Sequence, residues 1–438
     1  MSGIFIRACM TTACWLAAAS AALGQGMLDR PVVETAFELS VSQQFDEEAK
    51  PLIVVAASIP YRKLIFFLRD GRYEARYRVF LELENRRGPD APGRVWEETV
   101  TAAGFNETTS AARFASTRRT FPVEPGDYKA VVTVEVIDTS RRFREEQPLR
   151  VVGEASGRLE LSTPVFATCR ADSLSRKPRD GELAVSICPS GEGCRAAINP
   201  GGIYGDFDAW ARAAFGFVAP SADGGDSLVL TAVVRDARGV VVRYARERFG
   251  LGEARHSSLC IEMNLDNLSL GEYEIETVLE TIDGAQKSRA AGRFTVLFNA
   301  ALLTSRAGDL IDLLSLAADE RDARRVAEAP AAERVHAWAL FWRKLDPTPS
   351  TESNEAFGEF LQRLRHVLKA FSRHRPGWRT DMGRIYMGHG HPDRIEDRQG
   401  SRLGGNYQLW YYNSEGVVYI FEDPIGSGEY RLLSTEIM

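Results

Sequence analysis

The sequence contains no long apolar run beyond its first 24 residues. A membrane-spanning helix needs about 20 consecutive apolar residues, and the apolar stretches Pro51 to Ser58 and Leu64 to Leu68 are only long enough for strands. Positive charges are outnumbered by negative ones, because the formal net charge is −6 and the pI is about 5.7. Nucleic-acid binders and binders of anionic membranes need a concentrated positive surface. The composition therefore argues against both classes.

Histidine is scarce, with six in 438 residues. The run from His389 to Arg394, HGHPDR, imitates the H-x-H-x-D-H metal-binding run of metallo-β-lactamase-like hydrolases. Arg394 stands where that run has its last histidine, and no histidine follows His391 to supply the remaining ligands. We therefore expect no metal site and no cofactor, and we expect His389 and His391 to lie in an exposed loop.

Other catalytic patterns are also absent. The GSGE segment at Gly426 to Glu429 lacks the second glycine of a nucleophile elbow, and no G-x-x-x-x-G-K-[ST] phosphate loop occurs. Asp381 and Asp393 remain as a candidate pair of carboxylates for a glycosidase-like reaction. Aspartates in glycine-bounded turns more often accept backbone hydrogen bonds, and we expect that role for both.

Residues 1–24 have the pattern of a secretory signal peptide. Arg7 precedes an apolar, alanine-rich run from Ala8 to Leu23, and Ala22-Leu23-Gly24 is a cleavage site of small residues. An uncleaved membrane anchor is the alternative, although the run is short for a span. We expect a periplasmic or secreted protein that begins at Gln25 and has no membrane span after cleavage.

Cleavage leaves four cysteines in an exported chain, which indicates disulfide bonds. Four cysteines allow three pairings. Cys188 and Cys194 flank a flexible PSGEG loop that can close at small entropic cost, so we predict one bond between them and a second between Cys169 and Cys260. The alternative, a zinc site, has no CxxC pair or nearby histidine to support it.

Alternating apolar residues cut by turns extend from Phe37 to Val152, as in an antiparallel sandwich. Lys63 to Glu84 contains the clearest hairpin, with its turn at Arg69 to Arg72. Tyr128 follows a Pro-Gly-Asp corner and resembles the tyrosine corner of immunoglobulin-like sandwiches.

The corner recurs further along the chain. Gly126, Tyr128, Ile137 and Asp138 reappear 145 residues later as Gly271, Tyr273, Ile282 and Asp283. A repeat of this kind indicates two related structural units. We therefore predict two immunoglobulin-like β-sandwich domains, at residues 25–155 and 156–298.

The periodicity becomes helical after Phe298. Val335, Trp338, Trp342 and Leu345 lie on one face of a predicted helix over residues 331–345. A second apolar stripe, from Phe357 to Phe371, follows the prolines at 347 and 349. We predict a helical connector at residues 299–375 and a small α+β domain at residues 376–438. The predicted strands of that domain are residues 384–387, 407–412, 417–421 and 430–433.

The segment from Pro376 to Asp393, PGWRTDMGRIYMGHGHPD, begins with a turn at Pro376-Gly377. Arg384 to Met387 alternates like a short strand and ends at Gly388. We predict a structural motif in which Trp378 is buried and Asp381 accepts hydrogen bonds from turn N–H groups. Its members are Gly377, Trp378, Thr380, Asp381, Gly383, Arg384, Tyr386, Pro392 and Asp393.

These residues resemble the GWxTD-domain family of bacterial envelope proteins. The matching pieces are GWRTD (377–381), GRIY (383–386), the Gly390-x-Pro392-Asp393 loop, YQLWYYN (407–413) and GEYRL (428–432), with FWRKLDPTPSTESNE (341–355) upstream. The sequence departs from the family pattern at His389 and His391, where a tyrosine or similar residue and a proline are expected. The resemblance implies the multidomain, mainly β architecture given above and no settled reaction.

Aromatic residues are frequent in roughly the last 60 residues of the chain. Binding hot spots are enriched in Tyr, Trp and Arg. We expect a non-enzymatic exported protein with an interaction or scaffolding role in the cell envelope, whose partner is an envelope protein or a glycan. The candidate binding residues are Tyr411, His389, His391 and Arg394. The alternative is a hydrolase that acts on envelope polysaccharide or peptide through Asp381, Asp393 and the two histidines.

Overall fold

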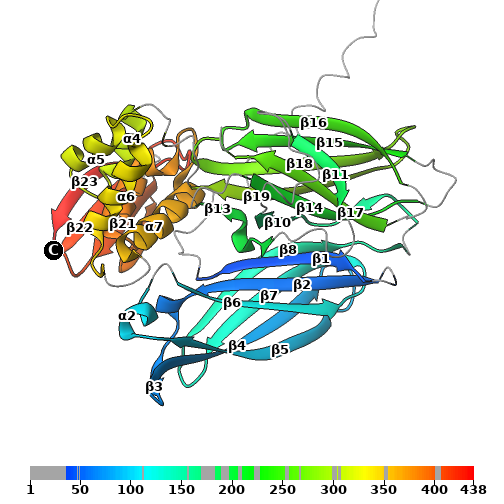
Figure 1. Ribbon diagram of the computed structural model, residues 1–438, viewed down its shortest axis with the longest axis horizontal. Coiled ribbons are helices and arrows are strands. Elements are labelled where there is room, and N and C mark those ends of the chain that lie inside the picture. The colour runs from blue at the N-terminus through cyan, green and yellow to red at the C-terminus, as the bar shows by residue number, and fades with distance from the viewer. Residues whose placement is uncertain are drawn as a thin grey trace, which may run out of the picture. The chain divides into compact units, whose positions relative to one another are not determined.

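A computed structural model gives the structure of the chain (Figure 1). It describes residues 36–168, 183–188, 197–205, 210–220, 227–251, 256–265, 268–297, 303, 307–349, 354–399 and 406–438, apart from 47, 49, 111, 112, 155 and 156. The predicted signal peptide therefore lies outside the described residues. The described chain forms two compact units, one within residues 35–390 and one that contains residues 391–438. The fold is mainly β, with several antiparallel sheets and a set of helices near the C-terminus.

The first two sheets enclose one apolar core, to which both contribute buried side chains such as Val41, Ile53, Val79 and Val132. One sheet has the order β1-β2-β6, and the other has the order β3-β4-β7-β8 with β5 also paired to β4. The strands are β1 (Glu38–Phe45), β2 (Pro51–Pro60), β3 (Phe67–Arg69), β4 (Arg72–Asn85), β5 (Ala91–Ala102), β6 (Phe114–Pro122), β7 (Gly126–Val136) and β8 (Arg142–Val151). Two short helices, η2 (Tyr61–Lys63) and α2 (Phe105–Thr108), lie between them in the chain. The predicted hairpin is confirmed, because Arg69 pairs with Arg72 across a turn in which Asp70 and Gly71 have positive φ.

Side-chain amides join β1 to the end of the facing sheet. Gln147 accepts from the N–H of Val41 at 3.0 Å and donates to its carbonyl at 2.9 Å. Gln43 does the same for Val152, at 2.8 and 2.7 Å. An amide side chain carries one donor group and one acceptor, like a peptide unit, so each glutamine satisfies strand-edge groups that would otherwise be unpaired.

A second pair of sheets encloses another core, with buried Phe215, Leu230, Ile261 and Phe294. One sheet has the order β11-β17-β14-β10-β12 with β9 on β14, and the other has the order β13-β19-β18-β15-β16. Their strands are β9 (Glu160–Leu161), β10 (Val165–Thr168), β11 (Leu183–Cys188), β12 (Ala197–Ile198), β13 (Ile203–Tyr204), β14 (Trp210–Val218), β15 (Ser227–Asp236), β16 (Val241–Gly250), β17 (His256–Asn264), β18 (Gly271–Thr281) and β19 (Lys287–Val296). A short 3-10 helix, η5 (Pro200–Gly202), precedes β13.

The two sandwiches, each formed by one pair of sheets around its own core, share one strand order. The order β5-β4-β7-β8 in the first matches β16-β15-β18-β19 in the second. Both repeated tyrosines donate to a carbonyl four residues earlier, Tyr128 to Glu124 at 2.9 Å and Tyr273 to Ser269 at 2.6 Å. This is the hydrogen bond that a tyrosine corner makes, and it fixes the entry into β7 and into β18.

Cys260 is buried in β17 and is disulfide-bonded. Cys169 and Cys194 lie outside the described residues, and only the backbone of Cys188 is described. The predicted pairings therefore remain predictions.

Helices follow the second sandwich in the chain. They are α4 (Ala307–Leu314), α5 (Glu320–Ala327), α6 (Arg334–Leu345), α7 (Glu355–Phe371), the 3-10 helix η7 (Gly377–Arg379) and α8 (Asp381–His389). The predicted stripe on α7 is confirmed by the burial of Phe360, Leu364, Leu368 and Phe371. None of the described helices is long and apolar enough to cross a membrane.

The C-terminal unit contains a four-stranded antiparallel sheet with the order β20-β21-β22-β23. Its strands are β20 (Arg394–Gln399), β21 (Asn406–Tyr412), β22 (Val417–Asp423) and β23 (Arg431–Ile437). The predicted hairpin turn lies between β21 and β22, with Gly416 at φ 66°. Alternation along β21 buries Trp410 and Tyr412 and leaves Tyr411 half-buried.

Candidate functional site

The motif around Trp378 is the start of a helix, so the prediction of a strand at Arg384 to Met387 is wrong. These four residues lie inside α8, and η7 precedes them. Thr380 is the N-cap residue: its hydroxyl accepts from the N–H of Gly383 at 3.0 Å and donates to the carbonyl of Gly377 at 2.7 Å. A four-residue alternation is too short to distinguish a strand from a helix. The N-cap bond favours the helix.

Two glycines in the motif allow backbones to approach closely. A Cβ atom on Gly377 would lie 1.8 Å from the carbonyl oxygen of Val367 in α7, and one on Gly383 would lie 1.9 Å from the carbonyl oxygen of Gly377. Ser372 holds the same turn through a 2.8 Å bond from the N–H of Gly377 to its hydroxyl. The motif therefore locks η7 between the end of α7 and the start of α8.

Trp378 fills the inside of this turn and is 4% exposed, as the sequence predicts for a buried residue. The guanidinium of Arg379 lies 4.6 Å from the centre of its ring and also forms an ion pair with Asp309 of α4. The indole N–H is buried and makes no hydrogen bond within the described part of the chain. A buried donor without a partner costs about 1–3 kcal/mol.

The C-terminal end of α8 is held by Arg363 of α7. Its guanidinium donates to the carbonyls of Met387 and Gly388, both at 2.8 Å. Gly390, at φ 78°, closes the helix by donating to Tyr386 at 2.8 Å. A cation at this position also interacts favourably with the helix dipole. Tyr386 is buried and stacks on His366 of α7, with ring centres 4.2 Å apart.

The remaining predicted residues of this segment take places along α8. Asp381 is its first residue, where a carboxylate interacts favourably with the positive end of the helix dipole. Arg384 is exposed on the helix, and His389 is its last residue, so the predicted loop position of His389 is wrong. The predicted hydrogen bonds from turn N–H groups to the Asp381 carboxylate stay a prediction.

The segment from His391 to Asp393 belongs to the C-terminal unit. Pro392 is buried, and the Nδ1 atom of exposed His391 lies 2.7 Å from the Pro392 carbonyl. The carboxylate of Asp393 accepts from the N–H of Asn413 at 2.6 Å, and the N–H of Asp393 donates to the carbonyl of Tyr411 at 2.8 Å. Asp393 therefore anchors the turn after β21, the structural role that the sequence predicts.

Tyr411 and its neighbours form an exposed charged surface on the C-terminal sheet. We define the Tyr411 face by Arg394, Glu396 and Arg398 of β20 and Tyr411 of β21. Arg394 lies opposite Tyr411 in the register, with its guanidinium 3.7 Å from the ring centre. The Tyr411 hydroxyl donates to Glu396 at 2.8 Å, and Arg398 donates to the same carboxylate at 2.9 Å. These hydrogen bonds lower the pKa of Glu396, and the bond from Arg398 has the larger effect.

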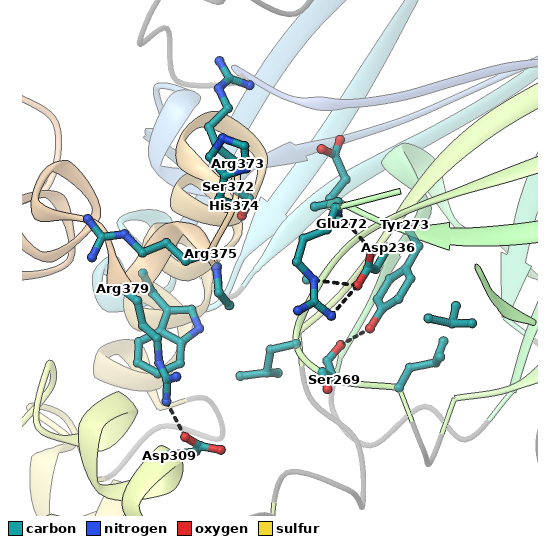
Figure 2. A pocket seen from close by; sticks show the side chains of 18 of the residues that line it. Asp236, Ser269, Glu272, Tyr273, Asp309, Ser372, Arg373, His374, Arg375 and Arg379 are labelled. Carbon is teal, nitrogen blue, oxygen red and sulfur yellow. Dashed lines mark hydrogen bonds and ion pairs between the residues drawn. The ribbon is translucent and has the colours of Figure 1, made fainter. Parts of the chain in front are cut away.

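A cavity of about 690 Å³ lies beside the motif turn, within the unit of residues 35–390. Figure 2 shows Arg373, Arg375 and Arg379 on one side and Asp236, Glu272 and Tyr273 of the second sandwich on the other. Trp378 lines the cavity as well. Its volume is within the range of about 300–1,000 Å³ that is usual for ligand pockets.

The lining contains five arginines and three carboxylates beside apolar residues. Burial alone would raise the pKa of Asp236, but hydrogen bonds from Arg238 and from backbone N–H groups lower it overall. Burial raises the pKa of Tyr273, whose hydroxyl is held by Ser269. Both groups therefore keep fixed protonation states at neutral pH, with Asp236 charged and Tyr273 neutral.

Sequence reasoning identified Trp378 but missed the cavity. Its walls come from the loop after β15, the loop before β18, α4 and the turn after α7, which are widely separated in the sequence. The basic run Arg373-His374-Arg375 could have indicated a site, but no site was predicted from it. Among the described residues, no three His, Cys, Asp or Glu side chains are grouped as metal ligands.

Comparison with known proteins gives one family and several distant structures. Residues 293–424 match the family model of the GWxTD domain. The C-terminal domain of the Streptococcus pyogenes antigen I/II-family protein AspA is 9% identical, with a TM-score of 0.17, over 60% of this chain and 100% of that one. The corresponding domain of Streptococcus agalactiae BspA is 9% identical, with a TM-score of 0.18, over 60% and 99%. No curated protein matches the sequence.

Proposed function

We propose that this chain, whose residues 293–424 match the model of the GWxTD domain, is an exported, non-enzymatic protein with an interaction or scaffolding role in the cell envelope. The observation that supports this proposal most is that polar residues of the motif form hydrogen bonds to the backbone. Thr380 caps α8 and Asp393 anchors a turn, each through hydrogen bonds to backbone groups. A general base must reach a substrate proton, and the Asp393 carboxylate is held by the backbone instead. This favours binding over hydrolysis.

The export part of the proposal rests on the sequence. We propose that residues 1–24 are a signal peptide and that the protein is periplasmic or secreted. The disulfide at Cys260 supports an oxidising compartment, and we propose Cys169 as its partner and a second bond between Cys188 and Cys194. Peptide mapping of exported, non-reduced protein tests these pairings. A crosslink between Cys169 and Cys188 would contradict them.

The two β-sandwiches offer loops and sheet faces to a partner. We propose that both sandwiches are immunoglobulin-like, supported by the repeated sheet order and by the hydrogen bonds of Tyr128 and Tyr273. The loops and sheet faces of such sandwiches can contact partners, although the fold by itself implies no particular function.

We place a first partner surface on the Tyr411 face. Arginine and tyrosine are enriched at binding hot spots, and here the two side chains are already in contact. The side chain of Arg394 is 61% exposed, so a partner can reach it. Because Tyr411 is fixed by Glu396 and stacked by Arg394, it loses little side-chain freedom on binding.

The enzyme and binding alternatives are separated by one assay with a matched variant. Purified mature protein is incubated with peptidoglycan and glycans, with and without added divalent metals, beside Asp393→Ala. We expect no turnover above that of the variant. Turnover that is present in wild type and lost in Asp393→Ala would overturn the proposal.

The partner surface is tested by crosslinking in envelope extract. We expect Arg394→Glu to lose a crosslinked partner that wild type retains, because charge reversal removes the stacked cation. Arg384→Glu is the control, since Arg384 is exposed on α8 and outside the Tyr411 face. Equal capture by both variants would remove the Tyr411 face from the proposal.

A further inference from the structure

The first sandwich ends in apolar side chains that its core does not cover. β3 and α2 lie at the same end of this sandwich (Figure 1), and their large apolar side chains are open to solvent: Phe67 is 40% exposed, Leu68 64% and Phe105 62%. Large contiguous apolar patches on a soluble protein mark contacts with other proteins or with membranes. We define the sandwich tip by Phe67, Leu68, Tyr73 and Phe105.

Three of the four tip residues form a continuous row. Leu68 lies directly opposite Tyr73 in the register of β3 and β4, so the two side chains share one face. The ring of Tyr73 packs against the sandwich core, and its centre lies 6.1 Å from the ring centre of Phe105. Phe67 alternates with Leu68 and therefore points to the other face of the hairpin. Apolar surface is thus exposed on both faces of β3.

The hairpin that carries Phe67 and Leu68 is an addition to the sandwich. Asp70 and Gly71, at φ 48° and 77°, close its tight turn, so the tip is held in a fixed shape. In the second sandwich β15 takes the place of β4, and within the described chain it pairs with β16 and β18 and with no third strand. Packing of the shared strand order therefore does not require the exposed residues of β3.

Positive charge lies next to the tip. Residues 61–76 contain five basic and two acidic residues, an excess of +3 in a chain whose net charge is −6. Asp138 pairs with Arg69 and Arg76 and lowers this local excess to +2. Arg72 is exposed at the start of β4, directly after the turn. Basic residues beside an apolar segment favour an anionic lipid surface, because the head groups attract the cations while the apolar side chains enter the lipid.

The exposure of both faces of β3 favours a lipid surface over a protein partner. A flat protein surface would cover one face of the strand and leave the other in water. A lipid surface is fluid and surrounds a hairpin that enters it, so it covers Phe67 and Leu68 at the same time. Burial of both side chains then adds to the binding free energy, which grows with the apolar area removed from water.

We propose that the sandwich tip inserts into the surface of an anionic lipid bilayer. Phe67, Leu68 and Phe105 enter the boundary between head groups and acyl chains, and Arg72 contacts a lipid phosphate. This inference goes beyond the proposed function, because it adds a lipid surface to a partner protein or glycan. It does not depend on the Tyr411 face.

The test is co-sedimentation of the mature chain, without residues 1–24, with lipid vesicles. One set contains phosphatidylglycerol and phosphatidylcholine in equal parts, and the other contains phosphatidylcholine alone. We expect stronger binding to the anionic vesicles, and this binding should weaken as salt is added. A thermal melt of each variant shows that it is folded before binding is measured.

Leu68→Asn measures the apolar part of the contact. It should lower the partition coefficient on anionic vesicles about tenfold or more, because a leucine side chain no longer enters the apolar layer. Leu340→Asn is the matched control, since Leu340 is 46% exposed on α6 and lies outside the tip. The control should bind as wild type does. Equal losses in the two variants would overturn the tip as the contact.

Arg72→Glu measures the contribution of charge. It should weaken binding to anionic vesicles about fivefold or more and leave binding to neutral vesicles unchanged. Arg384→Glu changes the net charge equally but lies on α8, outside the tip, and it should bind as wild type does. Equal losses in these two variants would overturn the contact between Arg72 and the lipid.

Two further outcomes would overturn the lipid assignment as a whole. One is the absence of binding to either set of vesicles. The other is a protein crosslink in envelope extract, or self-association of the purified chain, that Leu68→Asn loses while it keeps wild-type binding to vesicles. In that case the tip contacts protein. Neither outcome affects capture through the Tyr411 face, so failure here is distinguishable from failure of the proposed function.

Discussion

Trp378 and Tyr411 are both aromatic residues with an arginine over the ring, at 4.6 Å and 3.7 Å from the ring centre. Trp378 is buried in a turn whose glycines allow backbones to pack closely and whose threonine caps the next helix. Tyr411 is half-buried beside an exposed arginine. The difference shows that residue type alone does not separate a structural motif from a contact surface. The two are separated by how far each side chain is buried and by whether its hydrogen-bonding groups contact backbone or exposed side chains.

The largest expected effect separates these two aromatics directly. Trp378→Ala should lower the free energy of unfolding by about 3–5 kcal/mol, the usual loss for a buried large aromatic. Tyr411→Ala should cost less, about 1–2 kcal/mol, because a half-buried ring, one part-buried hydrogen bond and the contact with Arg394 are lost. Denaturant titration of both variants measures this. Similar losses in the two would erase the comparison.

A second effect concerns the close approach at the motif glycines. Gly377→Ala and Gly383→Ala each force a Cβ onto a backbone oxygen, and each should destabilise the protein by about 1–3 kcal/mol. Gly388 provides the matched control, because a Cβ there meets nothing within 4 Å and alanine is favoured in helices by about 0.5–1 kcal/mol. A destabilised Gly388→Ala variant would show that α8 is not the helix described.

The helix cap should give a smaller change. Thr380→Ala removes the hydroxyl that caps α8 and should cost about 0.5–2 kcal/mol. Thr380→Ser keeps the hydroxyl and should fall close to wild type. Thermal melts of the pair measure the cap, and equal melting temperatures for Ser and Ala would argue against a capping role.

The smallest expected effect lies on the exposed side. Hydrogen bonds from Arg398 and then Tyr411 lower the pKa of Glu396, so the favourable contribution of its carboxylate is present above its unfolded pKa and is lost as pH falls through the folded pKa. Arg398→Ala should raise the pKa of Glu396 towards its ordinary value without a measurable change in melting temperature. NMR titration of carboxyl carbons tests this, with Arg246→Ala as the control. An unchanged pKa in Arg398→Ala would contradict the arrangement of the Tyr411 face.

Alternation of apolar and polar residues predicted the strands well where the alternating segments were long. The hairpin at Arg69 to Arg72 and the tyrosine corners could be read from sequence because turn residues and alternation agree there. Alternation also placed Trp410 and Tyr412 on one buried face. These features are local, and the physics that selects them lies within a few residues.

The errors arose where local patterns were short or conflicting. Arg384 to Met387 alternates for four residues but belongs to α8, and the better signals were Thr380 as N-cap and Gly390 just after the helix. The strand at Arg394–Gln399 was missed because its sequence is strongly charged, as edge strands often are. The cavity depends on segments far apart in the chain, so no sequence window contains it.

The central claim, that the GWRTD motif is the buried start of a helix, is tested most directly by native-state hydrogen exchange of the full chain. The N–H groups of Gly383, Arg384 and Gly390 are bonded to Thr380 Oγ1, the Thr380 carbonyl and the Tyr386 carbonyl, at 3.0, 2.9 and 2.8 Å. The account predicts continuous, strong protection from Gly383 to Gly390. Protection of alternate residues, as in an edge strand, or exchange as fast as in an exposed loop, would contradict it.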